Sequence, residues 1–265
     1  MVGTSLLVAS APAAVVTLQS FADTFVTAGS VATGAGNPDA NYGGAGAVQI
    51  SGASTSKGAM QALLKFDLGS AKTTFDTTFG AGNWLINSIT LQLGTNFGTQ
   101  GIQPNNPIFN AVNTGLFKID WQANDSWGGE GAGNPGSPFF PSNPPTDGVT
   151  WNSIALLLGA SDENVGTFTY LPVGNTNPPS IPAASYALGL TPGFLADAIA
   201  GNVVSLRGYA GDNTVSYLFN AHSFGSNSPT LVVNAVAVPE PAVLGLLGAG
   251  VAFLTLRRRR HAPGL

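Results

Sequence analysis

Apolar and polar residues alternate along much of the chain. Residues 64–68 (LKFDL), 89–93 (ITLQL) and 117–121 (FKIDW) each place their apolar side chains on one face of an extended backbone. This period of two is the pattern of a strand with one buried face. Further strands are predicted at residues 23–27, 47–50, 167–171, 203–208, 215–219 and 230–236.

One short helix is predicted late in the chain. Thr191 can cap its first turn, Pro192 suits the first helical position, and Gly201 can end it. The long connections at residues 128–148 and 172–182 are rich in glycine and proline, which favours loops. The buried face of the helix is expected to consist of Phe194, Leu195, Ala198 and Ile199.

The order of these elements predicts the fold class. Strands dominate and helices do not alternate with them, so we expect an all-β fold, an antiparallel sandwich rather than a parallel α/β sheet. Loops rich in Gly, Pro and Asn can protect the edges of the sheets. The sequence gives no sign of a repeat or a second core, so we expect one domain over residues 17–236.

Charge is distributed unevenly along the 265 residues. Residues 1–241 hold all 13 acidic residues and five basic ones, a net charge of −8, whereas residues 242–265 hold four arginines and no acid. An acidic body repels the phosphates of nucleic acids, so no nucleic acid partner is expected. The chain has no cysteine, which excludes disulfides, thiolate catalysis and cysteine-bound metals.

The C-terminal end combines three features in a fixed order. Pro239, Glu240 and Pro241 precede an uncharged apolar stretch at residues 242–256. As a helix this stretch would be roughly 22 Å long, which is short against a hydrocarbon core of about 30 Å. The alternative is a buried C-terminal helix, but such a helix would need a polar face. The stretch ends at a basic cluster of Arg257, Arg258, Arg259 and Arg260.

These three features closely resemble the PEP-CTERM sorting signal. The resemblance implies that an exosortase, a membrane protease-transferase of Gram-negative bacteria, recognises Pro239, Glu240 and Pro241. It further implies that a C-terminal hydrophobic helix holds the chain in the inner membrane until the tail is removed. The arginines would then stay on the cytoplasmic side, which places the body of the protein outside.

The N-terminal end resembles the last part of a secretory signal peptide. Residues 6–8 are apolar, and small residues at 9–14 provide a cleavage site of the A-x-A type. We therefore expect residues 1–16 to be the remnant of a leader. The alternative is an ordinary chain terminus.

A second resemblance extends along the body. Residues 22–26 (ADTFV), 41–43 (NYG), 63–68 (LLKFDL) and 89–93 (ITLQL) resemble, in order, the first half of a DNRLRE-type domain. Residues 125–127 (DSW), Glu130, 149–152 (VTWN) and 228–233 (SPTLVV) resemble the second half. The family implies a jelly-roll-like β-sandwich, and some members are carbohydrate-binding modules. The chain departs from the family in its long insertion at residues 128–148.

Residues suited to catalysis are few. The two histidines are His222 and His261, and no Gly-x-Ser-x-Gly motif occurs. We expect His222 to be a polar residue on a late strand or turn. A glycosidase needs two carboxylates, and Asp120, Asp125 and Glu130 are close together in the sequence. However, Asp120 alternates with apolar neighbours as an ordinary strand residue does, so we expect no catalytic residue.

Aromatic residues near the loops suggest glycan binding. The candidates are Trp121, Trp127, Trp151, Phe139 and Phe140. Flat rings pack against the C–H faces of sugars, while neighbouring polar groups bind the hydroxyls. The alternative is that the tryptophans pack in the core and the phenylalanines form a satellite cluster under the loop.

Oxygen-bearing side chains near the turns suggest a structural calcium ion. Asp23, Asn41, Asp125 and Asp212 are the candidates, although no EF-hand spacing occurs. No other cofactor is expected. Nucleotide binding is not indicated, because no glycine-rich loop joins a strand to a helix.

The sequence thus predicts an exported, non-enzymatic protein of the cell surface or of the exopolysaccharide matrix. The alternatives are a polysaccharide-binding module and a glycan-active hydrolase or lyase. The expected partners are an exosortase, the membrane through the C-terminal helix, and an extracellular polysaccharide.

Overall fold

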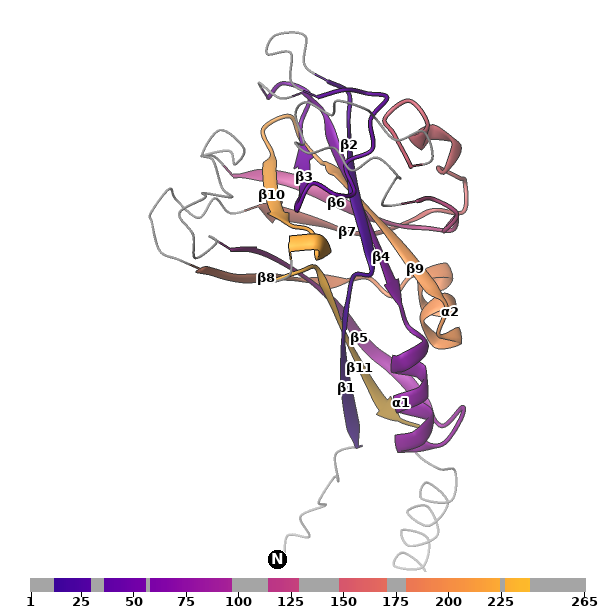
Figure 1. The fold of residues 1–265 in the computed structure, drawn as a ribbon. Helices are drawn as coiled ribbons and strands as arrows, with labels where there is room; N and C mark the ends of the chain where they lie inside the picture. Colours follow the sequence, from indigo (N-terminus) through magenta and orange to yellow (C-terminus); the bar gives the residue numbers. More distant parts are fainter. Residues whose placement is uncertain are drawn as a thin grey trace, which may run out of the picture.

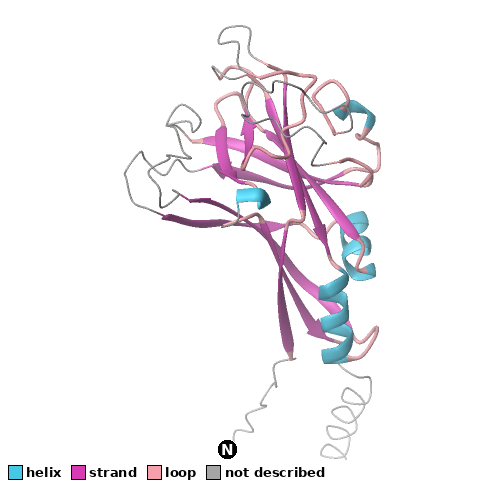
Figure 2. Ribbon diagram, viewed as in Figure 1, coloured by secondary structure: helices cyan, strands magenta, loops and turns pink. Residues whose placement is uncertain are grey.

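The computed structural model consists of two antiparallel β-sheets that pack against each other, with two helices at one side (Figures 1 and 2). This architecture confirms the all-β, antiparallel prediction at the level of two sheets. The more specific jelly-roll assignment stays a prediction. The structure describes residues 12–29, 36–55, 58–96, 114–128, 148–170, 180–224 and 227–238.

The smaller sheet, called sheet A, has the order β1-β11-β5-β8. Strand β11 lies in its centre and pairs with β1 on one side and with β5 on the other. None of the four strands contains an acidic or a basic residue. Their bounds are Ala13–Gln19 (β1), Thr230–Ala237 (β11), Trp84–Asn96 (β5) and Ser180–Leu188 (β8).

The larger sheet, called sheet B, has the order β10-β3-β4-β9-β6-β7, and β2 also pairs with β4. Every strand predicted from the sequence is present in one of the two sheets. Because neighbouring strands pair in register, the alternating residues of β4, β9 and β6 share two opposite faces. The bounds are Ala22–Thr27 (β2), Ala47–Ser51 (β3), Met60–Asp67 (β4), Gly115–Gln122 (β6), Glu163–Tyr170 (β7), Val203–Ala210 (β9) and Ser216–Asn220 (β10).

The main core fills the space between the two sheets. Phe66, Phe117 and Leu206 from sheet B and Ile89 and Leu231 from sheet A are fully buried in one cluster. Each such side chain contributes about 1.5–3 kcal/mol by leaving water. The continuous core is what holds the sheets face to face.

A second, smaller cluster covers part of the outer face of sheet B. Val26 and Leu63 from the sheet pack against Trp127, Val149 and Ile154. Ile154 begins a short 3-10 helix, η1 (Ile154–Leu156). The loop residues on both sides of the 129–147 segment therefore pack onto the sheet.

Two helices lie beside the sheets, although the sequence predicted one. The helix missed from the sequence, α1 (Gly69–Phe79), follows β4 directly and buries Ala71 and Phe75. It contacts β1, β5 and β11 of sheet A and also contacts α2. The threonine-rich sequence hides this helix, because only one narrow stripe of it is apolar.

The predicted helix is α2 (Pro192–Ala200). Thr191 is its N-cap residue, and Gly201 ends it in the left-handed conformation with a φ of 72°. Phe194 and Ala198 are buried as predicted, whereas Ile199 is 40% exposed, so its predicted burial is wrong. Helix α2 contacts both β9 and β5, so it connects the two sheets.

The first strand begins earlier than the sequence suggested. Residues 13–16, which the sequence placed in a leader remnant, form the first half of β1 and pair with β11. Ala14 and Val16 pack against the main core, because their side chains point toward it from alternate positions. Strand β8 likewise begins inside the connection predicted at residues 172–182.

Among the described residues, no helix is long and apolar enough to cross a membrane. The expected C-terminal hydrophobic helix, at residues 242–256, lies outside the part of the chain that the structure describes.

Candidate functional site

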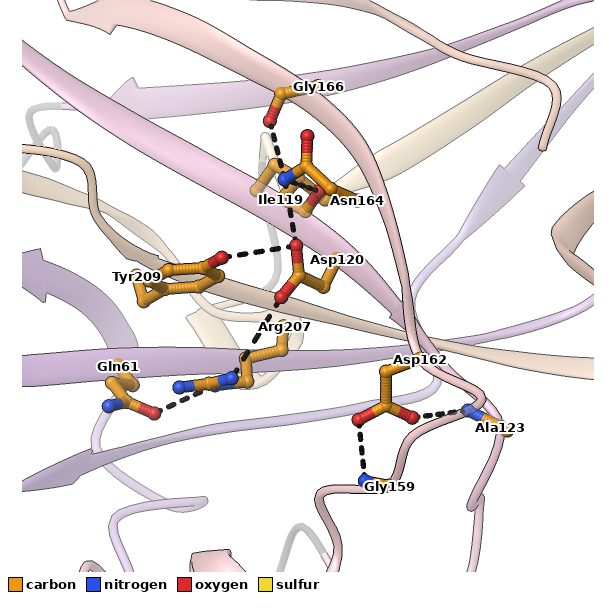
Figure 3. A network of polar contacts seen from close by, with 10 residues as sticks. All are labelled: Gln61, Ile119, Asp120, Ala123, Gly159, Asp162, Asn164, Gly166, Arg207 and Tyr209. Carbon is orange, nitrogen blue, oxygen red and sulfur yellow. Dashed lines mark hydrogen bonds and ion pairs between the residues drawn. The ribbon is translucent and has the colours of Figure 1, made fainter.

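A row of polar side chains crosses the outer face of sheet B. Arg207 on β9 lies opposite Asp120 on β6, and Asp120 lies opposite Asn164 on β7. Their neighbours in the chain point the other way, into the core, because side chains alternate along a strand. With Gln61 on β4 and Tyr209 on β9, these residues form what we call the polar row (Figure 3).

Arg207 is held in a fixed position within the polar row. Its Nε donates a hydrogen bond to Oε1 of Gln61 over 2.9 Å, and its guanidinium carbon lies 4.4 Å from the ring centroid of Tyr209. Its Nη1 lies 3.9 Å from Oδ2 of Asp120, and both side chains are 14% exposed. Burial lowers the pKa of the Arg207 guanidinium, and the Asp120 carboxylate opposes this effect.

One carboxylate oxygen of Asp120 accepts hydrogen bonds from two neighbouring side chains. Its Oδ1 accepts hydrogen bonds from Nδ2 of Asn164 over 2.8 Å and from the hydroxyl of Tyr209 over 3.3 Å. Burial and the nearby Asp120 carboxylate raise the pKa of the Tyr209 hydroxyl, so this hydroxyl stays protonated and donates. The other carboxylate oxygen of Asp120, Oδ2, faces Nη1 of Arg207 at a distance longer than a hydrogen bond. The row therefore presents a donor and an acceptor side by side.

Asp162 fixes the turn next to the polar row. Its carboxylate oxygens accept hydrogen bonds from the backbone N–H groups of Ala123, over 3.1 Å, and Gly159, over 3.0 Å (Figure 3). These two bonds join the end of β6 to the turn that precedes β7. The turn is thereby held by groups outside the polar row.

Of these residues, the sequence indicates Asp120 alone as a possible acid, whereas Gln61, Asn164, Arg207 and Tyr209 were not predicted. The signal that could have found them is the set of polar residues that alternate with the apolar ones along a strand, as in residues 205–209 (SLRGY). What the sequence does not give is the register that brings β4, β9, β6 and β7 together, because the residues lie far apart in the chain.

The tryptophans considered for glycan binding lie in two different places. Trp121 is 6% exposed and belongs to the main core, whereas Trp127 is 4% exposed and belongs to the outer cluster, against which Trp151 packs. Nε1 of Trp127 donates to Oγ of Ser205 over 2.9 Å. The burial of the first two agrees with core packing, and their glycan binding stays a prediction. Phe139 and Phe140 lie outside the described residues.

The three clustered carboxylates have separate surroundings. Asp120 belongs to the polar row, and Glu130 lies outside the described residues. Burial raises the pKa of the Asp125 carboxyl, although the Ser205 hydroxyl and the Lys65 ammonium act against this rise. Nζ of Lys65 is itself bound, since it donates to the carbonyl oxygen of Trp127 over 2.6 Å.

The calcium candidates bind groups of the protein itself. Asp23 is fully buried and accepts hydrogen bonds from the backbone N–H of His222, over 2.7 Å, and from Oγ of Ser20, over 3.1 Å. Nδ2 of Asn41 donates to the carbonyl oxygen of Val149. His222 lies in the short helix η2 (His222–Phe224), which follows β10.

The remaining calcium candidate, Asp212, accepts hydrogen bonds from the backbone N–H groups of Leu116, Thr214 and Val215. It therefore fixes the turn before β10. Within the described ranges, no three acidic or histidine side chains come together as a metal site.

The domain ends at a defined point in sheet A. Strand β11 ends at Ala237, whose N–H donates to the carbonyl oxygen of Pro12 over 3.1 Å, and the N–H of Val238 donates to Asn83 over 2.9 Å. Pro239, Glu240 and Pro241 follow at once in the sequence. These residues and the cluster of Arg257, Arg258, Arg259 and Arg260 lie outside the described residues.

Residues 237–260 match the family model of the PEP-CTERM protein-sorting motif. The sorting signal predicted from the sequence is thus confirmed. The PEP-CTERM motif supports export, recognition by an exosortase and transient anchoring in a membrane. No curated protein matches the chain.

The PEP-CTERM motif begins where β11 ends, so no linker separates it from the domain. The match covers only the C-terminal end, and the DNRLRE-type assignment of the β domain stays a prediction.

Proposed function

We propose that this chain is an exported, non-enzymatic protein of the cell surface or of the exopolysaccharide matrix of a Gram-negative bacterium. The observation that carries the proposal is the PEP-CTERM match at residues 237–260, joined directly to the last strand of a β domain. An exosortase recognises Pro239, Glu240 and Pro241 while the apolar stretch at 242–256 holds the chain in the inner membrane. The arginine cluster stays in the cytoplasm, and the domain reaches its final place after the tail is removed.

We propose that the β domain is a structural module. The order of its sequence segments supports a DNRLRE-type jelly roll. The non-enzymatic role is supported by Asp23 and Asp212, whose carboxylates accept hydrogen bonds from backbone N–H groups of η2 and β6. Carboxylates used in this way hold neighbouring segments in position.

Replacing Glu240 tests the sorting step. In a host that contains the exosortase, the Glu240→Ala variant is expected to accumulate in the membrane at its unprocessed length. Glu130→Ala is the matched control, because it removes the same side chain outside the motif. Deletion of residues 257–260 is expected to impair retention during transit. Normal processing of Glu240→Ala would contradict the proposal.

The polar row favours a second candidate function, the binding of a polysaccharide. Among the described residues, Arg207 donates a hydrogen bond only through Nε, so the N–H groups of Nη1 and Nη2 remain available to donate to a ligand. Oδ2 of Asp120 lies 3.9 Å from Nη1, and a sugar hydroxyl between them can accept from Arg207 and donate to Asp120. Because Asp120 repels other carboxylates, the row suits neutral, hydroxyl-rich sugars better than uronic acids.

Substitutions in the polar row test this second function. Binding of soluble neutral and acidic polysaccharides is measured by affinity electrophoresis for Arg207→Gln, for Asp120→Asn and for the control Lys72→Gln on α1. We expect at least about tenfold weaker binding of a neutral polymer for the first two variants, from the loss of charge-assisted hydrogen bonds. Unchanged binding would exclude the polar row, and no binding by the unmodified chain would leave the structural role.

A further inference from the structure

Exposed aliphatic side chains gather at the end of sheet A where the chain leaves the domain. Val15 is 60% exposed, Leu85 is 54% exposed and Val238 is 38% exposed. Val236 pairs with Ala13 on β1 and with Leu85 on β5, so these residues form a row across three strands. We call Ala13, Val15, Leu85, Val236 and Val238 the aliphatic end.

The aliphatic end lies on the outer face of sheet A. Its neighbours in the chain, Trp84 and Ala235, are buried in the core on the other face. Helix α1 packs on that inner side, where Phe75 lies 5.2 Å from the ring of Trp84. The four strands of sheet A contain no charged residue, so no charged side chain on them opposes contact with an apolar medium. A group of exposed aliphatic side chains of this kind is typical of an interaction surface.

The position of the sorting segment identifies the partner of this surface. Val238 is the last described residue, and the apolar stretch starts four peptide bonds later at Ala242. Four residues span at most about 14 Å when fully extended. While the tail is attached, the aliphatic end therefore stays within this distance of the start of the membrane segment.

The length of the membrane segment brings the domain closer still. A helix over residues 242–256 is roughly 22 Å long, against about 30 Å of hydrocarbon. The polar headgroup layer adds roughly 5–7 Å on each side of the hydrocarbon. A segment that is too short draws its flanking residues toward the hydrocarbon, so the residues just before it enter the headgroup layer.

We propose that the aliphatic end rests in the headgroup layer of the lipid bilayer while the PEP-CTERM tail is attached. This inference rests on the proposed function, because it needs the anchored state. The contact depends on aliphatic burial and not on charge, so it needs no anionic lipid and is insensitive to salt. It orients the domain with sheet A end-on to the membrane. Removal of the tail releases the domain, because so few side chains cannot hold it without the tether.

The absence of cysteine from the chain allows a direct test. Val15→Cys and Leu85→Cys in the full chain are labelled with an environment-sensitive fluorophore and placed in phosphatidylcholine vesicles. The matched control is Leu156→Cys, because Leu156 is 83% exposed on η1. By its colour in Figure 1, η1 lies at the end of the molecule opposite to the lower end of β1. The labels at positions 15 and 85 are expected to show a blue-shifted emission and at least about twofold more quenching by lipid-borne nitroxide than the label at 156. This difference is expected to disappear when the chain is cut after Val238.

Two controls separate this inference from the proposed function. If the full chain does not float with the vesicles, the anchoring fails and both proposals fall. If it floats but the labels at 15 and 85 remain as open to aqueous iodide as the label at 156, only the orientation is wrong. Shielding of the two labels without vesicles would also overturn the inference, because it would assign the surface to a second copy or to the N-terminal residues.

Discussion

At the scale of single residues, the N-terminus of α2 is capped from another element. Both carboxylate oxygens of Glu163, at the start of β7, accept the N–H of Gly193 over 2.9 Å, and one also accepts that of Phe194 over 3.0 Å. Thr191 is the N-cap residue but makes no capping hydrogen bond with its side chain. The Thr191 hydroxyl and the two N–H groups lower the pKa of the Glu163 carboxyl, despite an opposing effect of burial. A charge on β7 thus stabilises a helix that follows β8 in the chain.

Glu163→Gln is expected to destabilise the domain by about 0.5–1 kcal/mol at pH 7, in the lower part of the range for a helix cap. Because the pKa of Glu163 is lower in the folded protein, its contribution is present above the unfolded pKa of about 4.3. It is lost as the pH falls through the folded pKa. Urea unfolding at pH 7 and pH 3 measures both effects. A difference that persists unchanged at pH 3 would show that the charge is not responsible.

At the scale of the elements, α1 forms in spite of its sequence. The hydroxyl of each threonine donates to the carbonyl oxygen four residues earlier, an arrangement that does little to stabilise a helix. What holds the helix is the burial of Ala71 and Phe75 against sheet A. The bonded threonines are Thr73, Thr74, Thr77 and Thr78.

The double variant Thr73→Ala/Thr77→Ala is expected to raise the free energy of unfolding by about 1 kcal/mol, because alanine is the better helix former at exposed positions. Phe75→Ala is the contrasting variant and is expected to lower it by about 3–5 kcal/mol. Chemical denaturation measures both. If the threonine variant were less stable, the side-chain hydrogen bonds would contribute more than helix propensity.

The same elements show which parts of the fold can be predicted from the sequence. Strands with clear alternation, such as β5 and β6, were predicted because their pattern reports one buried face. The pattern fails for α1, where packing against sheet A overrides weak local propensity, and for β1, whose small apolar residues resemble a leader. The polar row escaped prediction for another reason. Its residues meet only through the pairing of β4, β9, β6 and β7, and a single sequence does not encode that register in any local pattern.

At the scale of the whole molecule, the residues on either side of the 129–147 segment lie next to each other. The N–H of Val149 donates to the carbonyl oxygen of Gly128 over 3.3 Å. Nδ2 of the fully buried Asn41 donates to Val149 over 2.9 Å. A Cβ at Gly148 would lie 2.3 Å from the same nitrogen, so only glycine fits there. The two ends of the insertion are therefore held together by the domain itself.

Replacing residues 129–147 with two glycines is expected to leave the fold intact, with a change in Tm of only a few degrees, because a short loop can join ends that already touch. Asn41→Ala is expected to lower the Tm more than this deletion, since it removes the buried hydrogen bond to the carbonyl oxygen of Val149. Thermal unfolding by circular dichroism compares the two.

The deletion also separates the two proposed glycan sites. Loss of polysaccharide binding in the shortened chain would assign binding to Phe139 and Phe140, and retained binding would favour Arg207 and Asp120. Loss of a cooperative transition would instead contradict the view that the domain is complete without the segment.

The central place of β11 has a mechanical consequence. A pull on the carboxyl terminus acts along this strand, which is hydrogen-bonded to β1 on one side and to β5 on the other. Tension at that end therefore loads both ladders in shear, and the bonds must break together and not one after another. A force transmitted through the C-terminal end of the domain therefore meets the shear resistance of both ladders first.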